Sequence, residues 1–141
     1  MISRKYKRYL GLDVSLSPGF AVIDVSARGR PKLIAAEAVT TTARDNDSAR
    51  YSYVEAKTSM LAFEYGPFAE IIREDYQTSR SKRARQAVFG AWAAVDVGLG
   101  RHGYKVTAHI TPTEVKRLVG GDGRADKDAV ANGVRRLLRL D

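Results

Sequence analysis

The chain has 141 residues, 24 of them Lys or Arg and 16 of them Asp or Glu, which gives a formal net charge of +8. Its length fits one domain with its own core over residues 1–141, and the absence of cysteine excludes disulfides and a thiolate zinc site. No apolar run approaches the roughly 18 residues of a membrane span, and the N-terminal residues lack the apolar core of a signal peptide, so we expect a soluble intracellular protein with no membrane partner. The positive charge favours a polyanion such as nucleic acid as partner, because each neutralised phosphate releases a condensed counterion.

The chain begins with three segments that are typical of strands. Residues 8–14 and 19–26 are hydrophobic and flank a polar turn, and residues 32–39 follow after a second turn. Consecutive strands joined by short turns predict an antiparallel meander. The first strand ends on Asp13. A carboxylate at the end of a buried strand is costly to desolvate without a partner, so a metal ion, a phosphate-bearing ligand or a hydrogen-bonded turn is expected beside it.

The rest of the chain alternates helices and strands. In chain order, the patterns predict a helix over 48–65, a strand over 68–74, a long Ala-rich helix over 83–101, a strand over 104–109, a short helix over 111–119 and a last helix from residue 126. The resulting order, β-β-β-α-β-α-β-α-α, is the connectivity of an RNase H-like α/β domain. That fold has a five-stranded mixed sheet, three antiparallel strands followed by two parallel ones, with helices on its faces.

Four segments resemble the RuvC family of Holliday-junction resolvases. Residues 11–22, Gly-Leu-Asp-Val-Ser-Leu-Ser-Pro-Gly-Phe-Ala-Val, are similar to the family's first catalytic motif, most closely to its phage-type variant. Residues 71–76, Ile-Ile-Arg-Glu-Asp-Tyr, resemble the second motif, a strand that delivers a catalytic glutamate. Residues 115–120 and 125–130 are similar to the two lysine-bearing segments near the active site. The resemblance therefore extends over nearly the whole chain and indicates a single RuvC-like domain.

The resemblance implies that Asp13 and Glu74 are catalytic residues and ligands of a divalent metal, Mg²⁺ with Mn²⁺ as a substitute. Phosphodiester hydrolysis needs a nucleophilic water and a stabilised leaving oxyanion, and two Mg²⁺ ions about 4 Å apart can serve both. Carboxylates on adjacent strand ends suit Mg²⁺, which prefers oxygen ligands. Each acid has an alternative explanation, since Asp13 could cap the turn that follows it and Arg73 offers an ordinary salt bridge for the acids near it.

Basic residues and one tyrosine are expected to contact DNA. Positive charge in the first turn of a helix opposes the helix dipole, so the cations before and at the start of the long helix favour phosphate binding over a structural purpose. Tyr76 is a candidate for stacking on an unpaired base, with an ordinary exposed loop tyrosine as the alternative. Lys116 and Lys127 are implied by the resemblance alone. The predicted DNA-binding residues are Tyr76, Arg80, Lys82, Arg83, Arg85, Lys116 and Lys127.

The chain departs from the family pattern in one respect. The family has a final Asp-x-x-Asp-Ala-Leu segment that completes its metal site, and no such segment occurs within the 141 residues. Asp126 and Asp128 fit a helix start instead. The resemblance as a whole predicts a metal-dependent endonuclease for four-way or branched DNA. A non-cleaving junction-binding dimer of the same fold and another RNase H-like nuclease acting on RNA are the alternatives.

The long helix predicts how two copies would meet. Its apolar surface, with Trp92, is broader than one core-facing stripe requires, which indicates either a homodimer contact through residues 83–101 or a central buried helix. Two symmetric active sites in a homodimer would cut two strands of a symmetric junction. The expected location is the cytoplasm of a bacterium, including one infected by a phage.

Overall fold

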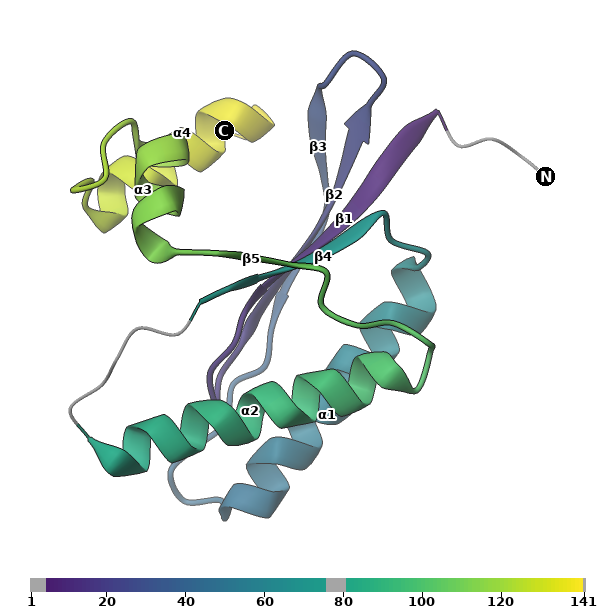
Figure 1. Cartoon of the computed structure of the whole chain (residues 1–141), viewed down its shortest axis with the longest axis vertical. Coiled ribbons are helices and arrows are strands. Elements are labelled where there is room, and N and C mark those ends of the chain that lie inside the picture. The colour runs from purple at the N-terminus through teal and green to yellow at the C-terminus, as the bar shows by residue number, and fades with distance from the viewer. Residues whose placement is uncertain (1–4, 76–80, 141) are drawn as a thin grey trace.

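The computed structural model describes residues 5–75 and 81–140, which form a mixed sheet flanked by helices. The elements are β1 (Tyr6–Asp13), β2 (Gly19–Ser26), β3 (Pro31–Ala38), α1 (Asp47–Tyr65), β4 (Glu70–Glu74), α2 (Lys82–Gly100), β5 (Ala108–Ile110), α3 (Pro112–Gly120) and α4 (Lys127–Leu138). The strand order is β3-β2-β1-β4-β5, with β1, β2 and β3 antiparallel and with β4 parallel to both β1 and β5 (Figure 1). The predicted element order and the RNase H-like fold are confirmed.

The fifth strand is shorter than the sequence predicts. It spans Ala108–Ile110, whereas the pattern predicts a strand over 104–109. The hydroxyl of Thr107 accepts the backbone N–H of Ile71 at 2.9 Å, while the Thr107 N–H donates to the Ile71 carbonyl at 2.8 Å. A side chain thus takes the place of one ladder bond, and regular pairing begins only at Ala108. The fourth strand begins at Glu70 instead of 68. Apolar residues also precede the first residue of each of these two strands, so the hydrophobic pattern alone could not locate where the strands begin.

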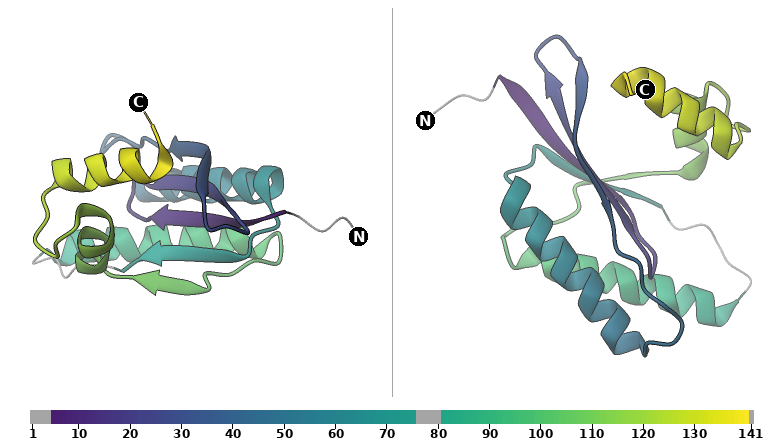
Figure 2. Two further views of the ribbon diagram at one scale, coloured as in Figure 1. Left: turned by 90° about the horizontal axis from the view of Figure 1, so that it is seen from above. Right: turned by 180° about the vertical axis from the view of Figure 1, so that it is seen from behind.

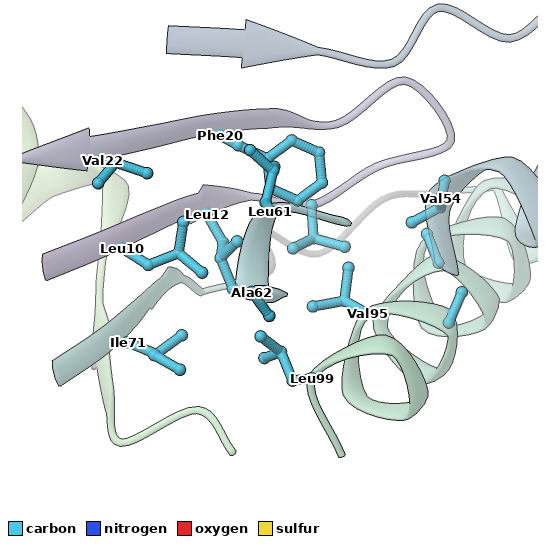
Figure 3. Close-up of a cluster of buried hydrophobic side chains, with 13 residues drawn as sticks. Leu10, Leu12, Phe20, Val22, Val54, Leu61, Ala62, Ile71, Val95 and Leu99 are labelled. Atoms are coloured by element: carbon cyan, nitrogen blue, oxygen red, sulfur yellow. The ribbon is translucent and has the colours of Figure 1, made fainter. Parts of the chain in front are cut away.

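One face of the sheet and the two long helices enclose the core (Figures 2 and 3). Its buried side chains come from β1, β2, β4, α1 and α2, and they include Leu10, Leu12, Phe20, Val22, Ile71, Val54, Leu61, Val95 and Leu99. Helices α1 and α2 approach closely at Gly98, where an added Cβ would lie 2.7 Å from the carbonyl oxygen of Glu55. Among the described residues, no helix is long and apolar enough to cross a membrane.

The opposite face of the sheet faces the α3–α4 hairpin (Figures 1 and 2). Thr111 caps α3 by accepting the N–H of Glu114 at 3.1 Å, and Asp126 caps α4 by accepting the N–H of Ala129 at 2.8 Å. The two helices cross at Gly133, where an added Cβ would overlap the Val119 carbonyl. Asp126 is therefore a helix cap, as the sequence predicts.

Candidate active site

Asp13 and Glu74 lie at the same edge of the sheet. Strands β1 and β4 are parallel neighbours with Leu12 opposite Arg73, so Asp13 and Glu74 occupy the next positions on the two strands. Both line the same two surface hollows. The pKa of Glu74 is raised, first by its partial burial and then by the negative charge of Asp13. The topology thus brings the two predicted acids together.

The turn after Asp13 is held by hydroxyl groups. The Ser15 hydroxyl accepts the N–H of Ser17 at 3.1 Å. Thr41, from the connection after β3, donates its hydroxyl to the Leu16 carbonyl at 2.5 Å, and its own N–H donates to the Ser17 hydroxyl at 3.2 Å. These bonds fix the turn independently of the Asp13 carboxylate, so turn capping does not explain this acid. No pattern in the sequence points to Thr41, which is buried and distant along the chain.

The larger hollow is an open groove of about 680 Å³ between the sheet and the α3–α4 hairpin. Small residues on the sheet keep its floor flat, and the hairpin contributes Val115 and Val134. The sheet residues that line it, besides the two acids, include Gly11, Gly19, Ala21, Ala36, Ala38 and Ile72. The smaller hollow, about 320 Å³, adds Asp75, Val88, Trp92 and Pro112 around the same acids. The carboxylates therefore face solvent where an extended substrate can reach them.

Lys116 is the predicted DNA-binding residue that lies close to the acids. Its positive charge acts on Glu74 and partly offsets the rise of that pKa. It lies on α3, which flanks the groove, whereas Lys127 is exposed at the first residue of α4. Lys116 thus brings a cation to the site, as the resemblance implies for this position.

The start of α2 carries three of the other predicted cations. Lys82, Arg83 and Arg85 are all exposed there. Arg83 forms an ion pair with Asp47 at the start of α1, with 2.6 Å between its Nη1 and the Asp47 Oδ2, and this contact lowers the pKa of Asp47. Arg83 therefore links two helix starts, and Lys82, Arg83 and Arg85 all stay predictions as phosphate contacts. Tyr76 and Arg80 lie outside the described residues.

Arg73 does not pair with the acids beside it in sequence. Its side chain lies on the helix-facing side of β4, and its Nη1 is 3.2 Å from the Asp96 Oδ1 on α2. A salt bridge between Arg73 and Glu74 is therefore not the reason for an acid at position 74. Trp92, on the helix predicted to form the dimer contact, is half-buried and stacks against this guanidinium, with 4.0 Å from the Arg73 Cζ to the ring centroid.

The two strand-end carboxylates fit a divalent cation. Within residues 5–75 and 81–140 no group of three or more His, Cys, Asp and Glu side chains could hold a metal ion. Two adjacent carboxylates, one of which raises the pKa of the other, are nevertheless a donor set that a divalent cation stabilises. Mg²⁺ usually takes only one or two protein carboxylates and fills its other positions with water and phosphate oxygens.

The strand order, together with the acids at the ends of β1 and β4, defines an RNase H-like protein. The model of the family "Crossover junction endodeoxyribonuclease RuvC" matches residues 9–141, so the chain belongs to the RuvC family. The RuvC of Thermobifida fusca is 34% identical over 135 residues, which cover 95% of this chain and 73% of that relative. The RuvC of Streptomyces avermitilis is 34% identical over 136 residues, which cover 95% of this chain and 76% of the relative.

Two solved structures have the same fold as this chain. The structure of T. thermophilus RuvC in complex with a Holliday junction substrate aligns with a TM-score of 0.85 at 26% identity, over 96% of this chain and 81% of that chain. A second structure of Thermus thermophilus RuvC aligns with a TM-score of 0.82 over 95% of this chain. The resemblance to the RuvC family inferred from four sequence segments is confirmed.

Proposed function

We propose that this chain is a metal-dependent endonuclease that hydrolyses phosphodiester bonds at four-way DNA junctions in the bacterial cytoplasm. The observation that carries the proposal is the placement of Asp13 and Glu74 at the ends of adjacent parallel strands, open to solvent and close enough for one to raise the pKa of the other. Family membership supplies the reaction class, because the family is that of crossover junction endodeoxyribonucleases.

Each residue of the site has a distinct task in this proposal. Asp13 and Glu74 hold a divalent ion, Mg²⁺ or Mn²⁺, on the rigid ends of two core strands. When bound, that ion supplies activation of water and neutralisation of charge on the phosphate. Lys116 adds a cation that attracts the phosphodiester toward the acids, whose own charge would otherwise repel it. Strand ends in the centre of a sheet hold these groups more accurately than loops would.

Exposed cations at the start of α2 are proposed to follow the DNA backbone. Replacing both Lys82 and Arg85 by Gln is expected to weaken junction binding and to reduce the slope of log affinity against log salt by about 1 for each phosphate that is no longer neutralised. Fluorescence anisotropy over a salt series measures both quantities. Lys32→Gln, which removes an exposed cation at the far end of β3, is the matched control and should leave the slope unchanged. If the double variant has the same salt slope as the unmutated chain, Lys82 and Arg85 do not contact phosphates.

A homodimer through α2 is part of the proposal. The helix buries one side against α1 and the sheet and leaves Ala93 and Val97 exposed on the other, with Val97 at 51%. Phe89, four residues before Ala93, extends this stripe, and its ring meets Trp92 edge-on. An apolar stripe along a helix that is already packed on its other side fits an isologous contact between two copies.

Val97→Glu is expected to raise the dimer dissociation constant at least about tenfold, because a charge would enter an apolar interface. Sedimentation velocity over a concentration series measures the constant. Leu118→Glu, at another exposed apolar position on α3, should leave it unchanged. A dimer that persists in Val97→Glu would show that another face joins the two copies.

One assay separates cleavage from binding alone. The unmutated chain is incubated with a labelled four-way junction and with a linear duplex of the same arm sequences, in Mg²⁺, in Ca²⁺ and in EDTA. The proposal predicts nicks in the junction in Mg²⁺, and binding without cleavage in Ca²⁺. Junction binding without cleavage in Mg²⁺ would support the non-cleaving alternative, and equal affinity for the duplex would contradict both.

A further inference from the structure

Arg73 is a buried arginine directly beside the proposed metal ligand Glu74. It is only 7% exposed, on a strand whose residues alternate between the two faces of the sheet. Ile71 and Arg73 face the helices, whereas Ile72 and Glu74 line the groove on the other side. A buried charge therefore occupies a position where the alternation calls for an apolar side chain.

The guanidinium of Arg73 joins two other elements to β4. Its Nη1 lies 3.2 Å from the Asp96 Oδ1 and its Cζ 4.0 Å from the Trp92 ring centroid, both on α2. Its Nη2 lies 3.2 Å from the Nε2 of His109, its register partner on β5. Because a guanidinium only donates hydrogen bonds, the ring nitrogen of His109 is the acceptor in this contact.

Stability alone is a poor explanation for this arrangement. Among the described residues the Arg73 Nε is buried with no hydrogen-bond partner, and the Asp96 side chain is 56% exposed, so its ion pair with Arg73 is screened by solvent. An apolar side chain of similar size often stabilises such a position as well as a buried charge or better. The contacts that the Arg73 guanidinium makes with α2 and β5 are therefore a better explanation for an arginine at this position than its contribution to stability.

Strand β5 contributes little backbone pairing at this edge. It spans only Ala108–Ile110, and the last backbone bond of the pair runs from the Asp75 N–H to the Ile110 carbonyl at 2.8 Å. The Arg73–His109 contact reinforces this short ladder one residue before Glu74. The contacts with Trp92 and Asp96 hold the same strand end to α2.

We propose that Arg73 is a positioning residue that fixes the end of β4, and with it Glu74, by binding α2 and β5 through its side chain. The inference rests on the proposed catalytic role of Glu74, but its structural part can be measured without cleavage. Arg73 does not touch the substrate or the metal in this proposal. Its loss should slow the chemical step and leave junction binding unchanged, because a small displacement of a reacting group can cost up to about 100-fold in rate.

The test compares Arg73→Met with Arg8→Met. Arg8 forms another part-buried ion pair, 2.7 Å from its Nε to the Asp24 Oδ1, at the opposite end of β1 from Asp13. Arg73→Met is expected to lower kcat for junction cleavage by about 10-fold or more with KM within about twofold. It should also speed hydrogen exchange at the Asp75 amide by about 10-fold. Arg8→Met should change neither quantity at a temperature where both variants are folded.

His109 provides a second pair of variants in case Arg73→Met does not fold. His109→Gln keeps an acceptor for Arg73 and should retain the native kcat and Asp75 exchange rate. His109→Leu removes the acceptor at an exposed position and should lower kcat and speed Asp75 exchange by a few-fold.

The outcomes that overturn the inference are distinct. Native exchange at Asp75 in Arg73→Met, faster exchange with unchanged kcat, or a raised KM with unchanged kcat would each contradict a positioning role. If the unmutated chain does not cleave junctions, the proposed function fails, and the Asp75 exchange rates still decide whether Arg73 fixes the strand end.

Discussion

Asp13→Asn is expected to lower the single-turnover rate of junction cleavage by about 100-fold or more while junction affinity stays within about threefold. Asparagine keeps the shape of the side chain but has no charge, and a neutral amide is a much weaker ligand for a divalent cation. Affinity is retained because Asp13 attracts the metal and not the DNA, whose phosphates it repels. Gel analysis of a labelled junction with excess protein measures the rate, and anisotropy in Ca²⁺ measures the affinity.

Glu70→Gln is the control for this experiment. Glu70 lies on β4, four residues before Glu74 and on the same face, but it pairs with Tyr9 at the start of the parallel ladder. The Glu70→Gln variant should cleave junctions at the same rate as the unmutated chain. Cleavage by Asp13→Asn at the native rate, or a loss of affinity that accounts for the whole loss of rate, would show that Asp13 is not a ligand of the catalytic metal.

Glu74→Gln is expected to abolish cleavage and, in metal-free buffer at neutral pH, to stabilise the protein. The pKa of Glu74 is higher in the folded protein than in the unfolded chain, first because of burial and then because of Asp13. The folded state therefore binds the proton more tightly. The stability that protonated Glu74 contributes is fully present below the unfolded pKa and is lost as pH rises through the folded pKa.

The variant should therefore exceed the unmutated chain in melting temperature at pH 7, by about 1–4 °C, and the difference should vanish near pH 3. The effect is small because solvent screens a half-exposed carboxylate. Differential scanning calorimetry from pH 3 to pH 7 measures it, with Glu70→Gln as the matched exposed control. Mg²⁺ should raise the melting temperature of the unmutated chain more than that of the variant. A ligand stabilises the folded state only to the extent that it binds, and the variant lacks one of the two proposed metal ligands. A melting temperature of Glu74→Gln that is lower at every pH would contradict the proximity of the two acids.

The sequence determines the element order and the meeting of the two acids for identifiable reasons. Apolar periods of two and of 3.6 residues separate strands from helices, and a helix between β1 and β4 favours a parallel pair. Parallel strands end at the same edge of a sheet, so Asp13 and Glu74 could be expected to lie together from the sequence alone. The strand pattern therefore suffices to predict that the two carboxylates of the candidate site lie together.

Side-chain partners from distant elements could not be predicted in this way. The sequence associates Arg73 with the acids next to it, whereas its partners come from α2 and β5. The contact between Trp92 and Arg73 likewise has no signal in the helical pattern. Thr41 supports the turn after Asp13 from more than 20 residues away. Such contacts depend on how packed elements cross, and local periodicity carries no information about that.

Paramagnetic broadening by Mn²⁺ tests most directly whether Asp13 and Glu74 together bind the divalent ion, on which the proposed function depends. Backbone amide resonances of the ¹⁵N-labelled protein are followed as substoichiometric Mn²⁺ is added. We expect the amides of Asp13, Glu74 and Ile110, at the carboxyl ends of β1, β4 and β5, to broaden first, and we expect Asp13→Asn to remove this effect. Broadening that begins elsewhere, such as around Asp126, or that persists unchanged in Asp13→Asn, would contradict a metal site built on these two acids.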